Sequence, residues 1–436
     1  MTLPELTRQL DPEPLGREMH ALIGRLYPIC RSITGNGVRR SLSILQEYAA
    51  LEMRELSTGM QVLDWVIPEE WNIHDAYIAD LHGRRVVDFQ ENTLHVMSYS
   101  TPVSERISVE QLRRHLHTIP DQPTVIPYRT SYYRKDWGFC LSQAVYDQLA
   151  DAEYDVVIDS ELTNGSLTYG ELVLPGETES EVLLSAHCCH PSMCNDNLSG
   201  VVLLIKLAGL LAGLRRHYTY RFLFVPGTIG SIAWLAQNEP VTSLIRHGLV
   251  AACVGDAGRF TYKRSRLGDA EIDRVVQVVL RDSRHEFGVR PFTPYGYDER
   301  QYCSPGFNLP VGVLSRTPYG EFPEYHTSAD NLDFVKPAYL GESLLVYAKV
   351  LEVLESNRVY RNLSPKGEPQ LGRRGLYSDV GGRKKSGDQE LAMLWALNQC
   401  DGTKSLLDIA ETSGMGFDVI SQAARELERN NLLVQV

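Results

Sequence analysis

Residues 181–200 read EVLLSAHCCHPSMCNDNLSG, and this stretch decides the fold class. An unbroken apolar run ends at His187, which is typical of a buried strand. Asp196 follows in the loop before an apolar helix pattern. In open α/β sheets this edge binds ligands, and imidazole and carboxylate groups are suitable ligands for zinc. The alternative is that Asp196 caps the helix and His187 is an ordinary core histidine.

Strand and helix patterns alternate along the chain after Pro175. The expected strands are 181–187, 220–225, 247–255 and 311–314, and the expected helices are 201–214, 229–237, 271–281 and 338–354. Continuous apolar strands that alternate with helices indicate a mostly parallel sheet covered by helices on both faces. We therefore predict an α/β core over residues 171–357.

Two different patterns precede this core. Residues 1–60 contain two helical patterns and are expected to form N-terminal helices of the same core. Residues 61–170 show short strand patterns broken by Pro and Gly, with one amphipathic helix over 109–117, which predicts an inserted β-rich domain. Within this domain, Asn164-Gly165 lies between two alternating runs and predicts a β-hairpin.

The C-terminal part has its own pattern. Residues 358–387 are rich in Gly, Arg, Lys and Pro and predict a linker. Residues 388–436 show three short helices and a final strand, which is the order of a winged helix-turn-helix. From Arg383 onward there are six Lys and Arg residues against eight Asp and Glu residues. Because this balance opposes phosphate binding, we expect a homo-oligomer or protein contact through this domain rather than DNA binding.

The composition is that of a globular chain, with 436 residues, 43% hydrophobic and 22% charged. A net charge of −12 disfavours nucleic acid as a partner. The longest apolar stretch, Val201 to Leu214, contains Lys206 and is shorter than the roughly 20 residues that a bilayer needs, so we expect no membrane span. The N-terminus shows no export signal and the eight cysteines are scattered, so we expect a cytoplasmic protein with reduced thiols.

A second polar run, EFPEYHTSADN at residues 321–331, precedes the last core helix. His187 comes first, then Asp196 within Asp-Asn-Leu-Ser-Gly, then His326 within His-Thr-Ser-Ala-Asp. This order resembles the co-catalytic zinc aminopeptidase family, which also contains glutaminyl cyclases. The resemblance implies that His187, Asp196 and His326 bind zinc and that the core has the fold of that family.

Some features of the family are missing. Where the family has Glu-Glu after the next strand, residues 225–230 read VPGTIG, without a carboxylate. The position of a further aspartate ligand falls near Cys253 or Asp256, and the carboxylate that follows the first histidine is replaced by Cys189. We therefore expect one zinc ion per chain, with a water molecule in the fourth coordination position.

The whole chain is similar to a bacterial aminopeptidase-like branch with an inserted β-rich domain and a C-terminal winged helix. The stretches that carry this similarity are 31–35, 64–68, 130–133, 137–140 and 298–306. We predict a zinc-dependent hydrolase of aminopeptidase type that acts on a small amide or peptide-like substrate with a free amine. The alternative is a non-catalytic zinc-binding scaffold or small-ligand binding protein with a degenerate peptidase site. A transcription regulator that reads DNA through residues 388–436 is disfavoured by the acidic balance.

Hydrolysis also needs a group that accepts a proton from water. Glu324 lies two residues before a predicted ligand, and we expect it to be this group, with Asp298 and Glu299 as the next candidates. Alternatively, Glu324 is a loop surface charge, and Asp298 and Glu299 pair with Arg300. The residues expected to bind the substrate are Arg300, Tyr302 and Tyr325.

Overall fold

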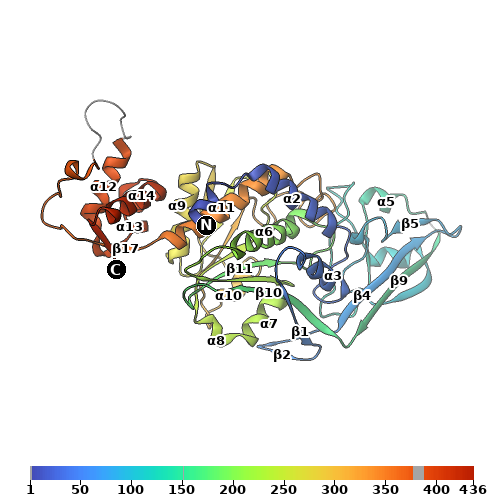
Figure 1. Cartoon of the computed structure of the whole chain (residues 1–436). Coiled ribbons are helices and arrows are strands. Elements are labelled where there is room, and N and C mark those ends of the chain that lie inside the picture. Colours follow the sequence, from blue (N-terminus) through green and yellow to red (C-terminus); the bar gives the residue numbers. More distant parts are fainter. Residues whose placement is uncertain (1, 151, 377–386) are drawn as a thin grey trace.

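The computed structural model describes residues 2–150, 152–376 and 387–436. A central sheet of eight strands has the order β1-β10-β12-β11-β13-β16-β14-β15 (Figure 1). Its strands are β1 (Glu52–Ser57), β10 (Ser166–Leu174), β12 (Thr219–Val225), β11 (Glu181–His187), β13 (Ile245–Ala251), β16 (Val311–Ser315), β14 (Phe260–Lys263) and β15 (Phe287–Arg290). The four strands β12, β11, β13 and β16 are parallel to one another. At one edge β10 is antiparallel to both β12 and β1, and at the other β14 is antiparallel to β16 but parallel to β15. The predicted α/β fold is confirmed, and the central sheet contains antiparallel pairs near both of its edges.

Helices cover both faces of this sheet, because the side chains of a strand alternate between its faces. One core contains Val182 and Leu184 of β11, and the other contains Leu183 between them. The helices of the first face are α2 (Pro12–Leu26), α3 (Asn36–Leu45), α6 (Gly200–Ala212), α9 (Glu271–Ser283) and α11 (Pro337–Ser356), with the short α1 (Leu3–Thr7) against α11. The opposite face has α7 (Ile229–Gln237), followed by α8 (Glu239–Thr242), and α10 (Glu299–Tyr302).

The apolar helix predicted after residue 200 is a core helix. Together with the turn η3 (Cys194–Ser199), α6 makes one helical stretch, Cys194–Ala212, that is long and apolar enough to cross a membrane by length and composition. However, 83% of an 18-residue window of that stretch is buried inside the protein. Its apolar character is therefore explained by packing between the sheet and the helices α2 and α11.

The inserted β-rich domain contains a four-stranded antiparallel sheet with the order β5-β4-β9-β6. The bounds are β4 (Glu70–Ala79), β5 (Arg85–Asp88), β6 (Val103–Ser108) and β9 (Glu153–Thr163), with the small pairs β2 (Gln61–Val62) with β3 (Trp65–Val66) and β7 (Leu116–His117) with β8 (Phe139–Cys140). Short helical turns lie between them: η1 (Thr93–His95), α4 (Val109–Leu112), η2 (Arg113–His115) and α5 (Gln143–Asp147). The helix predicted over 109–117 is thus shorter and ends in a strand.

The hairpin predicted at Asn164-Gly165 is wrong. These two residues connect β9 of the inserted sheet to β10 of the central sheet, and each strand pairs with other partners. The glycine serves close packing instead, because a Cβ atom on Gly165 would lie 2.3 Å from a carboxylate oxygen of Glu70. Since β10 belongs to the central sheet, the inserted part ends before Ser166 and not at residue 170.

The C-terminal unit is a winged helix that begins earlier than predicted. Its elements are β17 (Val359–Asn362), η4 (Gly372–Arg374), α12 (Gly387–Gln399), β18 (Asp401–Ser405), α13 (Leu406–Ser413), α14 (Phe417–Arg429) and β19 (Leu433–Gln435). Residues 358–387 are not simply a linker, because β17 pairs with both β18 and β19 and forms the centre of their sheet. Part of the predicted linker, residues 377–386, lies outside the described residues.

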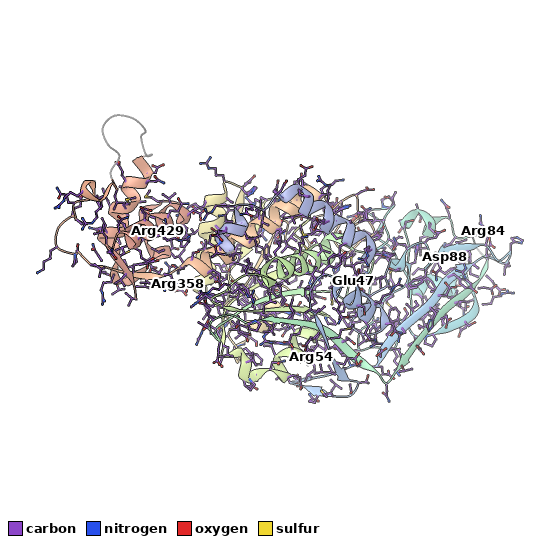
Figure 2. All side chains as sticks on the ribbon, viewed as in Figure 1. Glu47, Arg54, Arg84, Asp88, Arg358 and Arg429 are labelled. Carbon is purple, nitrogen blue, oxygen red and sulfur yellow. The ribbon has the colours of Figure 1, made fainter. Side chains whose placement is uncertain are left out.

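The winged helix packs directly on the core. Arg274 of α9 pairs with Asp408 and Glu411 of α13, and Asp282 accepts a hydrogen bond of 2.9 Å from the backbone N–H of Phe417, where α14 begins. Figure 2 shows Arg358 where this unit meets the core, whereas Arg84 and Asp88 lie at the far end of the inserted sheet. In a DNA-binding winged helix, α14 would be the recognition helix, and here its first residue contacts α9 of the core.

Candidate metal centre

The carboxyl end of β11 places two of the predicted ligands together. β11 is buried along its whole length and ends at His187, and Asp196 lies in the turn η3 at the start of α6. His187 Nε2 lies 2.8 Å from Asp196 Oδ1, and both side chains are 1% exposed. The edge of the parallel sheet thus holds an imidazole against a carboxylate, as the sequence pattern predicted.

His326 approaches the same carboxylate from the loop before α11. Its Nε2 atom lies 3.0 Å from Asp196 Oδ2, so Asp196 stands between two imidazoles. His326 and Cys253 both have a left-handed backbone, with φ of 55° and 52°. Non-glycine residues in that region are uncommon and cluster at functional sites. The structure therefore brings His187, Asp196 and His326 together.

A third histidine, His190, belongs to the same cluster and was not among the predicted ligands. It is 6% exposed, and its ring centroid lies 4.9 Å from that of His187 and 5.2 Å from that of His326. The possible ligand atoms of His187, His190 and Asp196 all lie within 4.8 Å of one another, and His326 is not in this group. The available signal was the spacing His187-x-x-His190, which places two imidazoles in one short loop.

Three buried polar atoms at this point have no hydrogen-bond partner: His190 Nδ1, Asp196 Oδ2 and His326 Nε2. The last two are close but not aligned as a hydrogen bond. Burial lowers the pKa of His190 well below its usual value, which keeps the imidazole neutral. Burial alone would raise the pKa of Asp196, but the imidazoles of His190 and His187 hold it well below its usual range. Neutral imidazoles around a carboxylate are the donor set that a divalent cation satisfies, so the residues fit a zinc ion.

Buried polar residues hold the loop that carries Asp196. Asp330 accepts hydrogen bonds from the backbone N–H groups of Cys194, Asn195 and Asp196 at 3.2, 2.5 and 2.8 Å. The amide of Asn197 donates to the carbonyl of Ala251 at 2.9 Å. These bonds tie the ligand-bearing turn to the loop after His326 and to the end of β13.

The two candidates for a further ligand are both excluded from the donor group. The carboxylate of Asp256 accepts hydrogen bonds from the Asn195 amide at 2.8 Å and from the Thr317 hydroxyl at 2.6 Å, so it holds loops together. Burial raises the pKa of the Cys253 thiol well above its usual value, which keeps the thiol protonated. Neither side chain lies in the compact group of possible metal ligands.

Asp298 is the predicted carboxylate with the most unusual environment. It is fully buried, and its Oδ1 accepts a hydrogen bond of 2.7 Å from the Ser231 hydroxyl, whereas Oδ2 is buried without a partner. Burial raises the pKa of Asp298 to about 6. Glu299 instead forms a buried ion pair of 2.7 Å with Lys263, so the predicted alternative of pairing with Arg300 is wrong for Glu299. Of this pair, Asp298 has a carboxylate oxygen without a hydrogen-bond partner.

The other predicted residues have different surroundings. Glu324 is half-buried, and its backbone carbonyl, rather than its carboxylate, accepts hydrogen bonds from Thr327. Tyr325 stacks on His326 with ring centroids 3.9 Å apart, which places it at the centre. Arg300 is exposed, and Tyr302 is fully buried with its hydroxyl 2.9 Å from that of Ser185. Tyr302 therefore belongs to the packing beneath the sheet and has no surface for a substrate, which corrects that prediction.

The inserted domain supplies one wall of the centre, which sequence reasoning missed. The backbone N–H of Tyr128 donates to the carbonyl of His326 at 2.8 Å, and the N–H of Ser328 donates to the carbonyl of Ile126 at 2.9 Å. The Tyr128 ring packs edge-on against His190 and His326, with centroids 5.1 and 5.2 Å away. Such pairing between segments two hundred residues apart leaves no signal in either segment alone.

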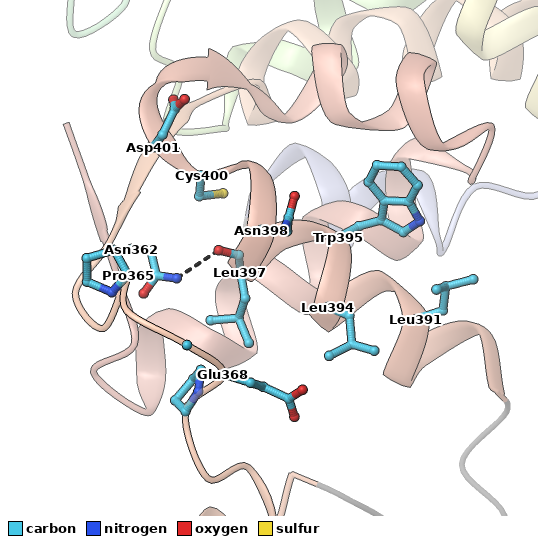
Figure 3. A pocket seen from close by; sticks show the side chains of 12 residues that line it. Asn362, Pro365, Glu368, Leu391, Leu394, Trp395, Leu397, Asn398, Cys400 and Asp401 are labelled. Atoms are coloured by element: carbon cyan, nitrogen blue, oxygen red, sulfur yellow. Dashed lines mark hydrogen bonds between the residues drawn. The ribbon is translucent and has the colours of Figure 1, made fainter.

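Two cavities differ in their relation to the centre. One of about 250 Å³ has Cys253 and Tyr319 in its wall, and the Tyr319 ring centroid lies 6.2 Å from that of His187. The other, of about 760 Å³, lies in the winged helix between α12 and residues 362–369, beside Leu391, Leu394 and Trp395 (Figure 3). The described residues contain one group of possible metal ligands, and it lies in the core and not in this second cavity.

A family model described as a domain of unknown function, DUF4910, matches residues 20–357. The chain belongs to this family. A winged helix-turn-helix model matches residues 358–435, in agreement with a unit that begins at β17. The DUF4910 region thus begins within α2 and contains α3, the inserted domain and the metal centre.

Known proteins resemble this DUF4910 chain at two levels. A Clostridium acetobutylicum protein named "Putative polysaccharide biosynthesis protein with aminopeptidase-like domain" is 53% identical over 418 residues, which is 96% of each chain. The crystal structure of a "putative peptidase" from the same organism has a TM-score of 0.94 at 52% identity and covers 98% of this chain and 97% of that one. BSAP, a zinc aminopeptidase from Bacillus subtilis, has a TM-score of 0.58 at 11% identity, over 78% of this chain and 95% of that one. The predicted resemblance to zinc aminopeptidases is confirmed, for the fold.

Proposed function

We propose that this chain is a zinc-dependent hydrolase of aminopeptidase type, which cleaves an amide or peptide-like substrate with a free amine. The observation that carries the proposal is the cluster of three buried, unpartnered polar atoms, which are Asp196 Oδ2, His190 Nδ1 and His326 Nε2. Two histidines and a carboxylate are also the protein donors of hydrolytic zinc sites that keep one position open for water. A bound zinc ion would polarise the substrate carbonyl and lower the pKa of a water molecule.

The residues around the centre support proton transfer. Asp298 is the proposed acceptor of the proton from water, because its Oδ2 is unpartnered and its pKa of about 6 suits a group that accepts a proton near neutral pH. The Ser231 hydroxyl holds the other oxygen and so fixes the orientation of the carboxylate. Tyr297 packs on His187, with ring centroids 4.4 Å apart.

The non-catalytic alternative is favoured by one specific observation. After β12, where the family has a glutamate pair, Gly227 carries no side chain, and a Cβ atom there would lie 1.9 Å from the ring of Tyr297. The Tyr297 hydroxyl also donates to the Gly227 carbonyl at 2.9 Å. No carboxylate can be placed there, so a zinc-binding scaffold or small-ligand binding protein is the second candidate.

The two candidates are distinguished by a substrate screen with matched variants. Zinc-loaded protein is tested on amino-acid amides, dipeptides and amide-bearing amino sugars, since the name of the Clostridium relative refers to polysaccharide biosynthesis. We expect Asp298→Asn to lower hydrolysis by about a hundredfold or more, and Glu324→Gln to leave it nearly unchanged. Zinc binding without turnover on any amide would favour the scaffold. A large loss in Glu324→Gln alone would make Glu324 the proton acceptor.

The metal content, the location and the partners of the protein are proposed from the ligand group and from the sequence. We propose one zinc ion per chain, because one compact group of ligands is present in the described residues. A cytoplasmic location and a protein contact or homo-oligomer through the winged helix are proposed from the sequence. The same applies to the proposal that nucleic acid is not a partner, with a net charge of −12 as its support.

A further inference from the structure

We infer that the third protein ligand of the ion is His190, and that His326 acts on Asp196 from outside the coordination sphere. The inference rests on the proposed zinc site and changes its ligand set. His190 takes the place that the family resemblance gives to His326. The family resemblance and this inference therefore predict opposite effects of removing His190 and of removing His326.

The first argument is the distance between the donors. A tetrahedral zinc ion with bonds of about 2.0–2.2 Å needs its donor atoms close together. His187, His190 and Asp196 form such a group, because their ligand atoms all lie within 4.8 Å of one another. His326 comes to 3.0 Å from Asp196 Oδ2, yet it does not join the group.

The second argument is burial. The side chains of His187 and Asp196 are 1% exposed and His190 is 6% exposed, whereas the His326 side chain is 34% exposed. The Nε2 atom of His326 is itself buried, so the exposed part of this side chain is the rest of its ring, and His326 lies on the more exposed side of the cluster. From there its Nε2 faces Asp196 Oδ2, which is the position of a group that orients a ligand carboxylate.

The third argument is the way in which His190 is held. Its carbonyl accepts hydrogen bonds from Arg31 Nε at 3.1 Å and Arg31 Nη2 at 2.9 Å. Arg31 is 1% exposed and donates its remaining Nη1 to the carbonyl of Leu26. A buried arginine that binds only carbonyls is costly to place, and here it fixes the backbone of His190.

The fourth argument is the space after β12. Gly227 offers no donor, and the Tyr297 ring occupies the space where a side chain would extend. His190 supplies a nitrogen donor from the loop of His187 itself. Two histidines and one aspartate then leave a fourth position open.

The test measures metal affinity and coordination rather than turnover. Purified full-length wild type and the variants His190→Ala, His326→Ala and His247→Ala are titrated with zinc against a chelator, and with cobalt(II) to record its visible absorption. His247 is the matched control, since it is a buried histidine with an unpartnered Nδ1 whose ring packs on Tyr218. His190→Gln is included as a second, less disruptive variant at the same position. Circular dichroism shows which of the proteins remain folded.

We expect His190→Ala and His190→Gln to lose zinc affinity by more than about a thousandfold and to lose the cobalt spectrum. His326→Ala should lose no more than about a hundredfold, the range for a group that orients a ligand, and should keep the band pattern. Loss of the metal in His326→Ala, alone or together with His190→Ala, would overturn the inference. If the variants behave as expected but wild type cleaves no amide, the ligand assignment stands and the hydrolase proposal fails. If wild type binds neither ion, both fail.

Discussion

Asp330 Oδ2 accepts a hydrogen bond of 2.8 Å from the backbone N–H of Asp196, which joins the two motifs of the centre. Oδ1 of the same carboxylate accepts from the N–H groups of Cys194 and Asn195. Asp330 is fully buried, and burial raises its pKa to about 7. The side chain of Asp330, which follows His326 in the second motif, therefore holds the backbone of the turn that carries Asp196.

The first prediction concerns this positioning role. We expect Asp330→Ala to destabilise the fold by about 2–4 kcal/mol and to lower zinc affinity as well, because it leaves the buried N–H groups of Asn195 and Asp196 without an acceptor. Asp273→Ala is the control, since Asp273 is a buried carboxylate that accepts from Tyr262 and Ser265 at another place in the core. Urea unfolding and zinc titration of both variants are the measurements. An equal loss of zinc affinity in the control would refute a positioning role.

The second prediction concerns pH. The pKa of Asp298 is raised by burial from 3.8 to about 6, so the folded protein binds this proton more tightly than the unfolded chain. The contribution to stability is therefore intact below about pH 3.8 and is lost as the pH rises through 6. In zinc-free protein, Asp298→Asn should be more stable than wild type by about 1–3 kcal/mol above pH 6.5, with the difference vanishing near pH 4. Denaturant unfolding at several pH values measures this, and a difference that grows toward low pH would contradict it.

The third prediction concerns the wall from the inserted domain. Tyr128→Phe removes only the hydroxyl contact of 2.9 Å with Tyr132 and should cost about 0.5–1.5 kcal/mol, with zinc affinity unchanged. Tyr128→Ala removes the ring that packs on His190 and His326 and should cost about 3–5 kcal/mol and weaken zinc binding. Thermal unfolding and zinc titration compare the pair. If Tyr128→Ala left zinc affinity intact, the inserted domain would not support the centre.

The fourth prediction concerns the winged helix. Because α14 begins against α9 and the unit is acidic, we expect no duplex DNA binding below about 10 µM at 150 mM salt. Arg274→Glu places like charges beside Asp408 and Glu411 and should lower the unfolding midpoint of the whole chain. Salt-sensitive, submicromolar DNA binding by the intact protein would contradict the expectation for DNA.

The sequence predicted the core well where its signal is local. The alternation of apolar strands and helices after Pro175 identifies the sheet, because buried parallel strands are apolar on both faces. Asn164-Gly165 failed as a hairpin because strand pairing depends on distant partners, here β12 for one strand and β4 and β6 for the other. The linker prediction missed β17 for the same reason.

The candidate site was predicted in part for a similar reason. His187 and Asp196 follow from strand and loop position, and His326 follows from its motif. His190 was visible in the quoted stretch, but its neighbourhood depends on the Arg31 contact and on Tyr128, which come from distant segments. The buried environment of Asp298 arises from Ser231 and the packed core around it, which no local pattern shows.

The most direct test of the central claim combines zinc content with amide hydrolysis in one preparation of wild type and Asp196→Ala. Asp196 lies between the histidines in every version of the centre, so its loss removes the site whichever histidine binds. We predict about one zinc ion per wild-type chain and zinc-dependent cleavage of an amine-bearing amide, with both lost in the variant. Wild-type protein that retains no zinc, or hydrolysis that persists in Asp196→Ala, would contradict the account.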